Sequence, residues 1–340
     1  MRQAEPAQGH LLRRRHVPWR PVPMSAGPRR LRGRCVSTAL FRDDPENCGK
    51  CNRACPGGQP CSAGFCVSSF GTEGTEPGQF TLPADVAVAP NGDIYVVEFG
   101  FDERRIQRFA ADGTFDRVVL EPGDFGAIRH AAVAPNGNIY VVDADSNLVQ
   151  EVFADGELGI SFGGFGTEPG QFNGARGIAV TPNGTISVVD RNNNRVQRFS
   201  TSGTPLDLWG GPGDGDGEFN LPEGIAVSPD GTKVYVADAG NNRIQRFNAG
   251  GAFQLEWGAS PQLVGPIDLT VAPNGDVFVI ELGASRLQRF SADGDPLGQL
   301  ATPGSGLGQV VQPRGVAVGP DGDVYVADTR NNRVQRFDPA

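Results

Sequence analysis

The sequence predicts an all-β fold made of repeated units, and three observations support this. One phrase occurs six times, and its turn glycines are spaced 45, 47, 47, 44 and 47 residues apart. Each copy contains short apolar runs separated by Asn-Gly or Asp-Gly, which are hairpin signals. The chain has 48 Gly and 27 Pro in 340 residues, and many of them separate the apolar runs. A repeat of this length built from short strands is typical of a propeller blade, so we expect a six-bladed β-propeller. The turn glycines are Gly92, Gly137, Gly184, Gly231, Gly275 and Gly322.

The fourth copy illustrates the strands expected in each blade. Its apolar runs and the weaker run after them predict strands at 225–227, 234–237, 244–247 and 252–257. Asp-Gly joins the first two strands and Asn-Asn joins the next two, so neighbours should be antiparallel, with the Asn-Gly and Asp-Gly turns supplying positive backbone angles. The runs are almost continuously apolar because each blade is expected to pack between two others.

The two ends of the repeat region complete each other. Phe70 precedes Phe80 by ten residues, the same spacing that separates Phe162 from Phe172 at the end of a blade. The sixth repeat stops after its third strand, at 337–340. We therefore expect a strand near 67–70 to pair with 333–337, which would close the ring and leave no open edge.

Residues 67–340 resemble NHL repeats in the recurring phrase Asn-Asn-Arg-(Ile/Val)-Gln-Arg-Phe and the valine-rich runs before it. The resemblance covers about four fifths of the chain, and it implies a six-bladed propeller. Some NHL proteins bind RNA, and other six-bladed propellers are peptide-amidating lyases or calcium-dependent lactonases and esterases.

Two segments precede the repeats. Residues 1–34 hold nine Arg and one acid, which predicts a disordered basic tail. Residues 35–66 hold all six cysteines, which predicts a module with three disulfides of undetermined pairing. A zinc site is the alternative, but the module has no histidine and four thiolates would leave two over. The module resembles stigma-specific-like Cys-rich modules in Asn47-Cys48-Gly49-x-Cys51 and Cys61-x-x-Gly64-x-Cys66. The cysteines are Cys35, Cys48, Cys51, Cys55, Cys61 and Cys66.

Charge and cysteine usage bear on location and partners. Disulfides indicate an extracellular or cell-surface protein. Residues 1–34 contain no apolar core of a secretory signal, so we expect that the natural start differs or that a signal has been lost. No apolar run is long enough to cross a membrane. Residues 67–340 carry a net charge of −17, which argues against nucleic acid as a partner. We expect a monomer that binds a protein, small molecule or glycan.

An acid at the end of the second strand and an arginine at the start of the third recur in the copies. They flank one turn, so we interpret them as pairs that stabilise the hairpin rather than as a catalytic or metal-binding ring. The second copy has Leu148 in place of the arginine, which leaves Asp143 without that partner. The acids are Glu98, Asp143, Asp190, Asp238, Glu281 and Asp328, and the arginines are Arg105, Arg195, Arg243, Arg286 and Arg333.

Two adjacent positions before the innermost strand differ between copies. In a propeller this loop lines one mouth of the central channel, where ligands bind. The first position reads Ala84, Arg129, Arg176, Glu223, Ile267 and Arg314, and the second reads Asp85, His130, Gly177, Gly224, Asp268 and Gly315. We predict a ligand site there, with ordinary variation at a solvated rim as the alternative. The predicted site residues are Asp85, Arg129, His130, Arg176, Glu223, Asp268 and Arg314.

Catalytic groups are scarce in the repeats. His130 is their only histidine, which excludes a three-histidine zinc site such as that of the peptide-amidating lyases, and they contain no cysteine. Residues 213–218 hint at a calcium loop but align with an ordinary inter-blade loop. We expect no cofactor, with calcium as the alternative. The favoured function is a binding scaffold rather than an enzyme. The alternative is a metal-dependent hydrolase or lyase of the lactonase/arylesterase type, using Asp85, Asp268 and His130.

Overall fold

A computed structural model describes residues 43, 48, 54–100, 104–121, 125–259 and 261–339. The predicted basic tail, Cys35 and Cys51 lie outside these residues. In the described part, no helix is both long and apolar enough to span a bilayer.

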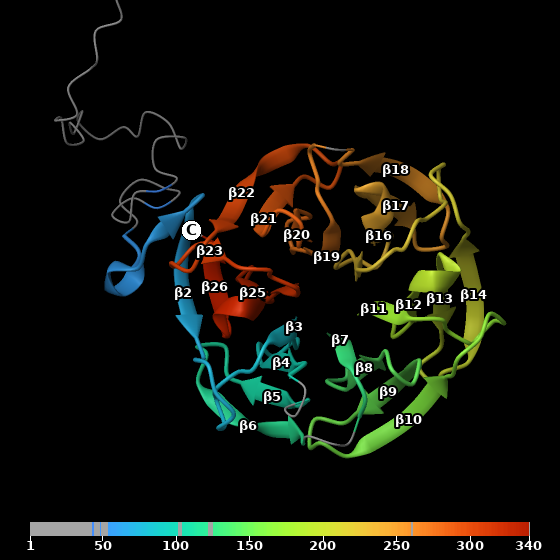
Figure 1. Cartoon of the computed structure of the whole chain (residues 1–340), viewed down its shortest axis with the longest axis horizontal. Helices are drawn as coiled ribbons and strands as arrows, with labels where there is room; N and C mark the ends of the chain where they lie inside the picture. Colours follow the sequence, from blue (N-terminus) through green and yellow to red (C-terminus); the bar gives the residue numbers. More distant parts are fainter. Residues whose placement is uncertain are drawn as a thin grey trace, which may run out of the picture. The chain divides into compact units, whose positions relative to one another are not determined.

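Six antiparallel sheets are arranged as blades in a ring around a central channel (Figure 1). Each blade has its first strand at the channel and its last strand at the rim. The predicted all-β, six-bladed propeller is therefore confirmed. The strands of blades one to three are β3 (Pro83–Val88), β4 (Ile94–Glu98), β5 (Ile106–Phe109), β6 (Phe115–Leu120), β7 (Ile128–Val133), β8 (Ile139–Asp143), β9 (Leu148–Val152), β10 (Leu158–Gly163), β11 (Ala175–Val180), β12 (Ile186–Asp190), β13 (Arg195–Phe199) and β14 (Pro205–Gly210).

Blades four to six follow the same order, and two of them gain a fifth strand. A short parallel strand, β23, adds to the rim of blade five, and β1 adds to the rim of blade six. The sequence did not predict either strand. The strands are β15 (Ile225–Val227), β16 (Lys233–Asp238), β17 (Arg243–Asn248), β18 (Phe253–Trp257), β19 (Pro266–Val271), β20 (Val277–Glu281), β21 (Arg286–Phe290), β22 (Pro296–Pro303), β23 (Gln309–Val310), β24 (Val316–Val318), β25 (Val324–Asp328), β26 (Arg333–Pro339), β2 (Phe65–Phe70) and β1 (Cys61–Ser62).

The two turns of each blade use different residues to reverse the chain. In the first turn of blade one, the Gly92 N–H donates to the Ala89 carbonyl at 2.9 Å. Gly92 has φ of 90° and the asparagine before it does not have positive φ, so glycine alone supplies the left-handed angle there. In the second turn of blades two, three, four and six the left-handed residue is an asparagine, as at Asn242 with φ of 54°, and in blade five it is Ser285 with φ of 47°. The short 3₁₀ helices are η2 (Pro56–Gly58), η3 (Arg191–Asn193), η4 (Ala239–Asn241) and η5 (Thr329–Asn331).

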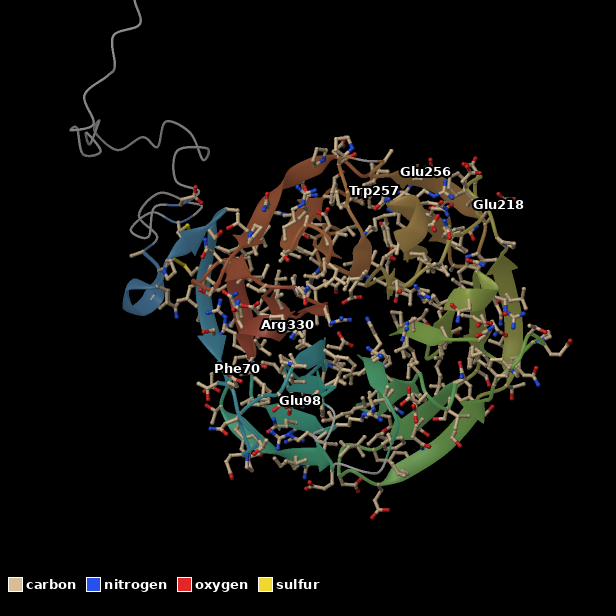
Figure 2. The ribbon with its side chains drawn as sticks, viewed as in Figure 1. Phe70, Glu98, Glu218, Glu256, Trp257 and Arg330 are labelled. Carbon is tan, nitrogen blue, oxygen red and sulfur yellow. A yellow bond between two sulfur atoms is a disulfide. The ribbon has the colours of Figure 1, made fainter. Side chains whose placement is uncertain are left out.

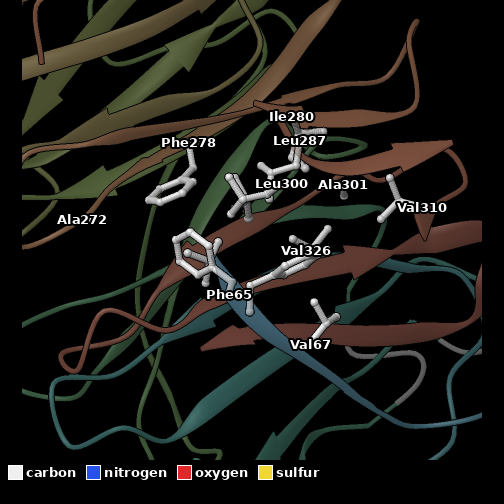
Figure 3. Close-up of a cluster of buried hydrophobic side chains, with 13 residues drawn as sticks. Phe65, Val67, Ala272, Phe278, Ile280, Leu287, Leu300, Ala301, Val310 and Val326 are labelled. Carbon is white, nitrogen blue, oxygen red and sulfur yellow. The ribbon is translucent and has the colours of Figure 1, made fainter. Parts of the chain in front are cut away.

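The hydrophobic core is divided into six clusters, one between each pair of neighbouring blades. In the cluster between blades five and six, Phe65 packs edge-on against Phe278, with ring centroids 6.3 Å apart (Figure 3). Val67 and Val326 are fully buried in the same cluster. Both faces of a blade are therefore buried, which explains the nearly continuous apolar runs.

The predicted closure of the ring is confirmed. Strand β2 pairs with β26, and Val67 lies opposite Phe337 while Phe70 lies opposite Val334 (Figure 1). Phe70, labelled in Figure 2, reaches the opposite face of the blade and packs against Phe109 of blade one, with the two ring centroids 5.0 Å apart. The N-terminal strand thus contributes to the clusters on both sides of blade six.

Two disulfides lie beside this closure. Cys48 is bonded to Cys61, and Cys55 is bonded to Cys66. Cys61 and Cys66 face each other across the β1–β2 hairpin, so both bridges fasten this hairpin to the preceding segment. For these four cysteines the disulfide prediction is confirmed over the zinc alternative, since Cys48 is not available as a thiolate.

Candidate functional site at the channel mouth

The repeated acid and arginine form a clamp together with a glutamine. In blades one, three, four, five and six the arginine Nε lies 2.6–2.8 Å from the acid. The glutamine two positions later donates to the same carboxylate. The acids are fully buried, so these ion pairs are part of the folded core. The interpretation of these residues as stabilising pairs is confirmed.

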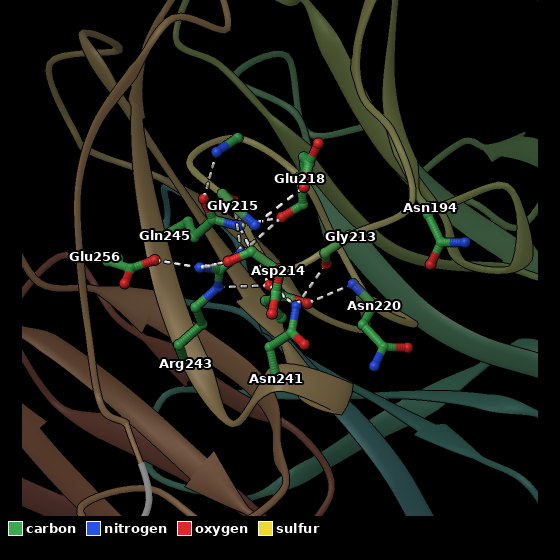
Figure 4. Close-up of polar contacts among 12 residues, drawn as sticks. Asn194, Gly213, Asp214, Gly215, Glu218, Asn220, Asn241, Arg243, Gln245 and Glu256 are labelled. Carbon is green, nitrogen blue, oxygen red and sulfur yellow. Dashed lines mark hydrogen bonds and ion pairs between the residues drawn. The ribbon is translucent and has the colours of Figure 1, made fainter.

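Blade four shows what the clamp holds together (Figure 4). The Asp238 carboxylate accepts from Arg243 at 2.7 Å and from the Asn220 backbone N–H at 2.8 Å. The Arg243 guanidinium donates to the carbonyl oxygens of Gly215 and Glu218, both at 2.9 Å. One guanidinium therefore ties the second turn of the blade to the loop that enters the blade.

The same contacts account for the calcium-like pattern in residues 213–218. The Asp214 carbonyl also accepts from Arg243, at 2.7 Å. The Glu218 side chain turns back onto the Gly215 N–H at 3.0 Å. A positive charge already sits among these carbonyl oxygens, and it is the side chain of Arg243.

Blade two lacks this clamp. Asp143 accepts instead from the Ser146 hydroxyl and from the Gly126 N–H, the latter at 3.0 Å. Gln150 turns away and donates to the Gly159 carbonyl at 3.0 Å. Asp143 thus has partners in its own turn and in the loop that enters the blade, and it does not line the cavity at the channel mouth.

The positions that differ between copies lie together at the channel mouth in two layers. The upper layer, formed by the first variable position, lines a cavity of about 130 Å³. The lower layer is formed by the second variable position, and its residues His130 and Gly177 also line the cavity. All seven predicted site residues take part in one layer or the other. The residues that line the cavity are Ala84, Arg129, His130, Arg176, Gly177, Glu223, Ile267, Leu282 and Arg314.

The charges of the upper layer are distributed unevenly around the channel. On the side of blades three and four, Glu223 forms ion pairs with Arg176 at 3.3 Å and with Arg191 at 2.5 Å. On the side of blade one, the Arg129 and Arg314 guanidinium groups lie 4.3 Å and 5.6 Å from the centre of the Phe99 ring. Within the described ranges, the side chain of neither arginine forms a hydrogen bond or an ion pair.

The lower layer is a bridge across the channel. His130 of blade two reaches Asp268 of blade five, with Nε2 2.9 Å from the carboxylate, and its Nδ1 lies 3.3 Å from Asp85 of blade one. Both aspartates are 1 % exposed. Asp85 also accepts from the Ala131 N–H and Asp268 from the Val316 N–H, each at 2.8 Å. The three side chains therefore connect blades one, two, five and six.

Glycine at the other lower positions leaves room for this bridge. A Cβ atom at Gly315 would lie 2.3 Å from a carboxylate oxygen of Asp85. A Cβ atom at Gly224 would lie 2.8 Å from the Cα atom of Asp268. Gly224 and Gly315 thus leave space for Asp268 and Asp85, respectively.

Burial and mutual attraction control the protonation of the bridge. Burial by itself would lower the pKa of His130, but the Asp85 and Asp268 carboxylates outweigh it and raise that pKa to about 9. Burial raises the pKa of Asp85 to about 7, against the opposing attraction of His130. At neutral pH the bridge therefore holds an imidazolium ion between two carboxyl groups.

The three bridge residues also have a donor set that suits a metal ion. One ligand atom from each of Asp85, His130 and Asp268 lies within 4.8 Å of the others. One oxygen of Asp85 and the Nδ1 atom of His130 are buried and have no hydrogen-bond partner. A divalent cation would have to replace the proton-mediated contact between His130 and Asp268, because imidazole binds metals in its neutral form.

Sequence reasoning missed three residues of the upper layer: Phe99, Arg191 and Leu282. All three occupy one position, immediately after the repeated acid, which also varies between copies. This third variable position was the signal that could have identified them. In chain order it reads Phe99, Ala144, Arg191, Ala239, Leu282 and Thr329.

Comparisons with known proteins agree with the fold. The sequence profile of the NHL repeat matches residues 172–199, 219–247 and 311–337, which belong to blades three, four and six. A search of the curated proteins found none that matches the sequence significantly.

Solved structures with the same architecture include several with different activities. A streptogramin B lyase shares 16 % identity at a TM-score of 0.59, covering 80 % of this chain and 97 % of the lyase. A gluconolactonase from Xanthomonas campestris shares 16 % identity at a TM-score of 0.62, and the match covers 82 % of this chain and 90 % of the gluconolactonase. A chain of a nidogen–laminin complex shares 15 % identity at a TM-score of 0.53, and the match covers 67 % of this chain and 90 % of that chain. At these identities the likeness concerns the fold alone.

Proposed function

We propose that this six-bladed β-propeller, which matches the NHL repeat in blades three, four and six, is a binding scaffold whose ligand enters the channel mouth. The observation that carries this proposal is the convergence of the variable positions on one cavity. Residues that differ between otherwise similar blades line it, whereas the repeated charged residues are used within the clamps. A cavity of about 130 Å³ is smaller than the roughly 300–1,000 Å³ of most small-molecule sites. It would therefore hold one protruding group of a ligand or partner.

A cavity-filling substitution tests this proposal without removing a charge. Ile267→Trp places an indole in the upper layer, and Ile160→Trp places the same side chain on the outer strand β10 as a control. A panel of uncharged, cationic and anionic small molecules would be tested by thermal shift on the full chain. We expect saturable binding that Ile267→Trp abolishes and Ile160→Trp preserves. Binding that survives Ile267→Trp would place the ligand elsewhere and contradict the proposal.

A metal-dependent hydrolase or lyase is the second candidate. The metal-compatible donor set of Asp85, His130 and Asp268 favours it. Those residues would hold the ion, which would polarise a carbonyl group or activate water. This candidate requires a stoichiometric metal in the purified protein, a lower melting temperature in EDTA, and turnover of an ester or lactone that His130→Gln abolishes. Protein that is metal-free, indifferent to EDTA and inactive on p-nitrophenyl acetate and gluconolactone would favour the scaffold.

We also propose an extracellular or cell-surface location. The two disulfides support it, because such bonds persist in oxidising compartments. The resemblance of residues 35–66 to stigma-specific-like modules is consistent with the same location. Mass spectrometry of the native protein without reduction would test this: all cysteines reduced in freshly lysed cells would contradict it.

A further inference from the structure

We propose that the channel mouth binds an oxyanion group, a carboxylate or a phosphate, between Arg129 and Arg314. This inference deepens the proposed scaffold function and rests on it. It names the chemistry of the ligand and the side of the mouth at which the ligand is held.

The two arginines flank the one blade whose side chain at this level is a methyl group. Arg129 belongs to blade two and Arg314 to blade six, so Ala84 of blade one lies between them in the ring. The acidic residue of the upper layer, Glu223, belongs to blade four and is paired with Arg176 and Arg191. The space beside Ala84 is therefore bordered by two guanidinium groups that form no direct ion pair with a carboxylate of the described residues, although Glu223 attracts both of them from across the mouth.

Phe99 holds these cations in place. Both guanidinium groups lie within 6 Å of its ring centre, a distance at which a cation is attracted to an aromatic face. The contact orients the groups while leaving their N–H donors unused, and the Nε atom of Arg129 is buried without a partner. Planar guanidinium groups with free donors match the geometry of carboxylate and phosphate.

The electrostatic state of the arginines supports the same ligand class. Burial lowers the pKa of Arg129, and the neighbouring Arg176 and Arg314 lower it further. Burial also lowers the pKa of Arg314. A half-buried cation without an ion-pair partner has lost part of its hydration, and an anion in the cavity would relieve that cost. The positive mouth stands in a repeat region with a net charge of −17, so it would select anions locally.

The size of the cavity fits a head group. The cavity volume of about 130 Å³ lies below the roughly 300–1,000 Å³ of most small-molecule sites, so a small head group rather than a whole ligand fits inside. A carboxylate or a phosphate group with the atom that bears it needs a space of this order. The remainder of a longer ligand would extend from the mouth into solvent.

Two simple anions test the proposal. Succinate and inorganic phosphate would be titrated into the full chain, with calorimetry and thermal shift as readouts, and the tighter of the two identifies the preferred oxyanion. We expect saturable binding by at least one of them. Arg129→Gln and Arg314→Gln should each weaken it about tenfold or more, since hydrogen bonds to charged groups are lost. Arg117→Gln, which removes the same charge from the outer strand β6, should leave affinity unchanged.

The opposite results are equally clear. Absence of saturable binding by both anions would overturn the inference, as would equal weakening by Arg117→Gln, which would indicate a general charge effect. The scaffold proposal would survive that failure if an uncharged or cationic compound bound and Ile267→Trp abolished its binding. Failure of every compound in the panel would count against both.

Discussion

The clamps and the channel mouth are both rich in arginine and acidic residues, but the arginines have different partners in the two regions. In the clamps, Arg243 and its equivalents meet a buried acid and several backbone carbonyls. At the mouth, Arg129 and Arg314 meet the face of one phenylalanine and no acid among the residues that the structure describes. The clamps repeat in five blades, whereas the residues that the blades contribute to the mouth vary from Ala to Arg, Glu and Ile.

The difference teaches which charges the fold itself requires. A buried charge whose partners come from the same repeat stabilises every blade in the same way. A charge that folding leaves without a partner adds no such stability, and local departures of this kind are expected at functional sites. Repetition therefore separates structural from candidate functional residues within one residue type.

Removing the closure strand should produce the largest effect on the repeated part of the molecule. Deletion of residues 67–71 takes away most of β2, including the fully buried Val67 and the packed Phe70. We expect loss of the cooperative fold or a fall in melting temperature of at least about 10 °C, because core is lost on both faces of blade six. Calorimetry measures it, and Ser69→Ala on the exposed side of the same strand is the control. An unchanged melting temperature would contradict the closure.

Breaking one clamp should have the next largest effect. Arg243→Met leaves Asp238 fully buried without its counterion, and the loop at 214–218 loses its donor. We expect the free energy of unfolding to fall by about 3–5 kcal/mol. Urea unfolding measures this loss. Arg198→Met, whose partner Asp207 is exposed, should cost no more than about 1 kcal/mol, and equal losses in the two variants would refute a special role for the clamp.

The pH dependence of stability should reveal the charge on the bridge. The pKa of Asp85 is raised to about 7 and that of His130 to about 9, so the folded state holds more protons than the unfolded state. Their contribution is present at acidic pH and is lost as pH rises through 7 and then 9. We expect the free energy of unfolding to fall by up to about 3 kcal/mol between about pH 6.5 and pH 9, since one pKa unit corresponds to about 1.4 kcal/mol.

Urea unfolding at several pH values measures this slope, and His130→Gln should flatten its upper part. A bound metal would require a neutral histidine, so metal-loaded protein should instead become more stable as pH rises. The sign of the slope therefore distinguishes an imidazolium bridge from a metal site.

The smallest effect should come from the matched substitution at the mouth. Arg314→Met removes a half-buried guanidinium that has no ion-pair partner among the described residues. We expect the free energy of unfolding to stay within about 0.5 kcal/mol or to rise by up to about 1 kcal/mol, because an uncompensated charge is replaced by an apolar side chain. If Arg314→Met lowered the free energy of unfolding as much as Arg243→Met does, the channel mouth and the clamps could not be distinguished by their contribution to stability.

Repetition made much of the molecule predictable from sequence. The period gives the blades, the ten-residue spacing before Phe80 gives the strand that closes the ring, and the acid and arginine flank one turn. These features depend on residues near each other in the chain, or on the rule that a propeller leaves no open edge. Comparing the copies also located the mouth, since it is where they differ. The third variable position, with Phe99, was overlooked although the same comparison contains it.

The sequence by itself determined the architecture, the seam and the positions that surround the channel. Only the tertiary structure decided which of those residues meet. His130 and Asp268 are 138 residues apart and belong to opposite blades, and they touch because closure of the ring brings opposite blades within reach of one side chain. Glu223 pairs with Arg176 and Arg191, and no acid of the described residues forms an ion pair with Arg129 or Arg314. This choice depends on side-chain direction and reach, which are set by packing rather than by local pattern.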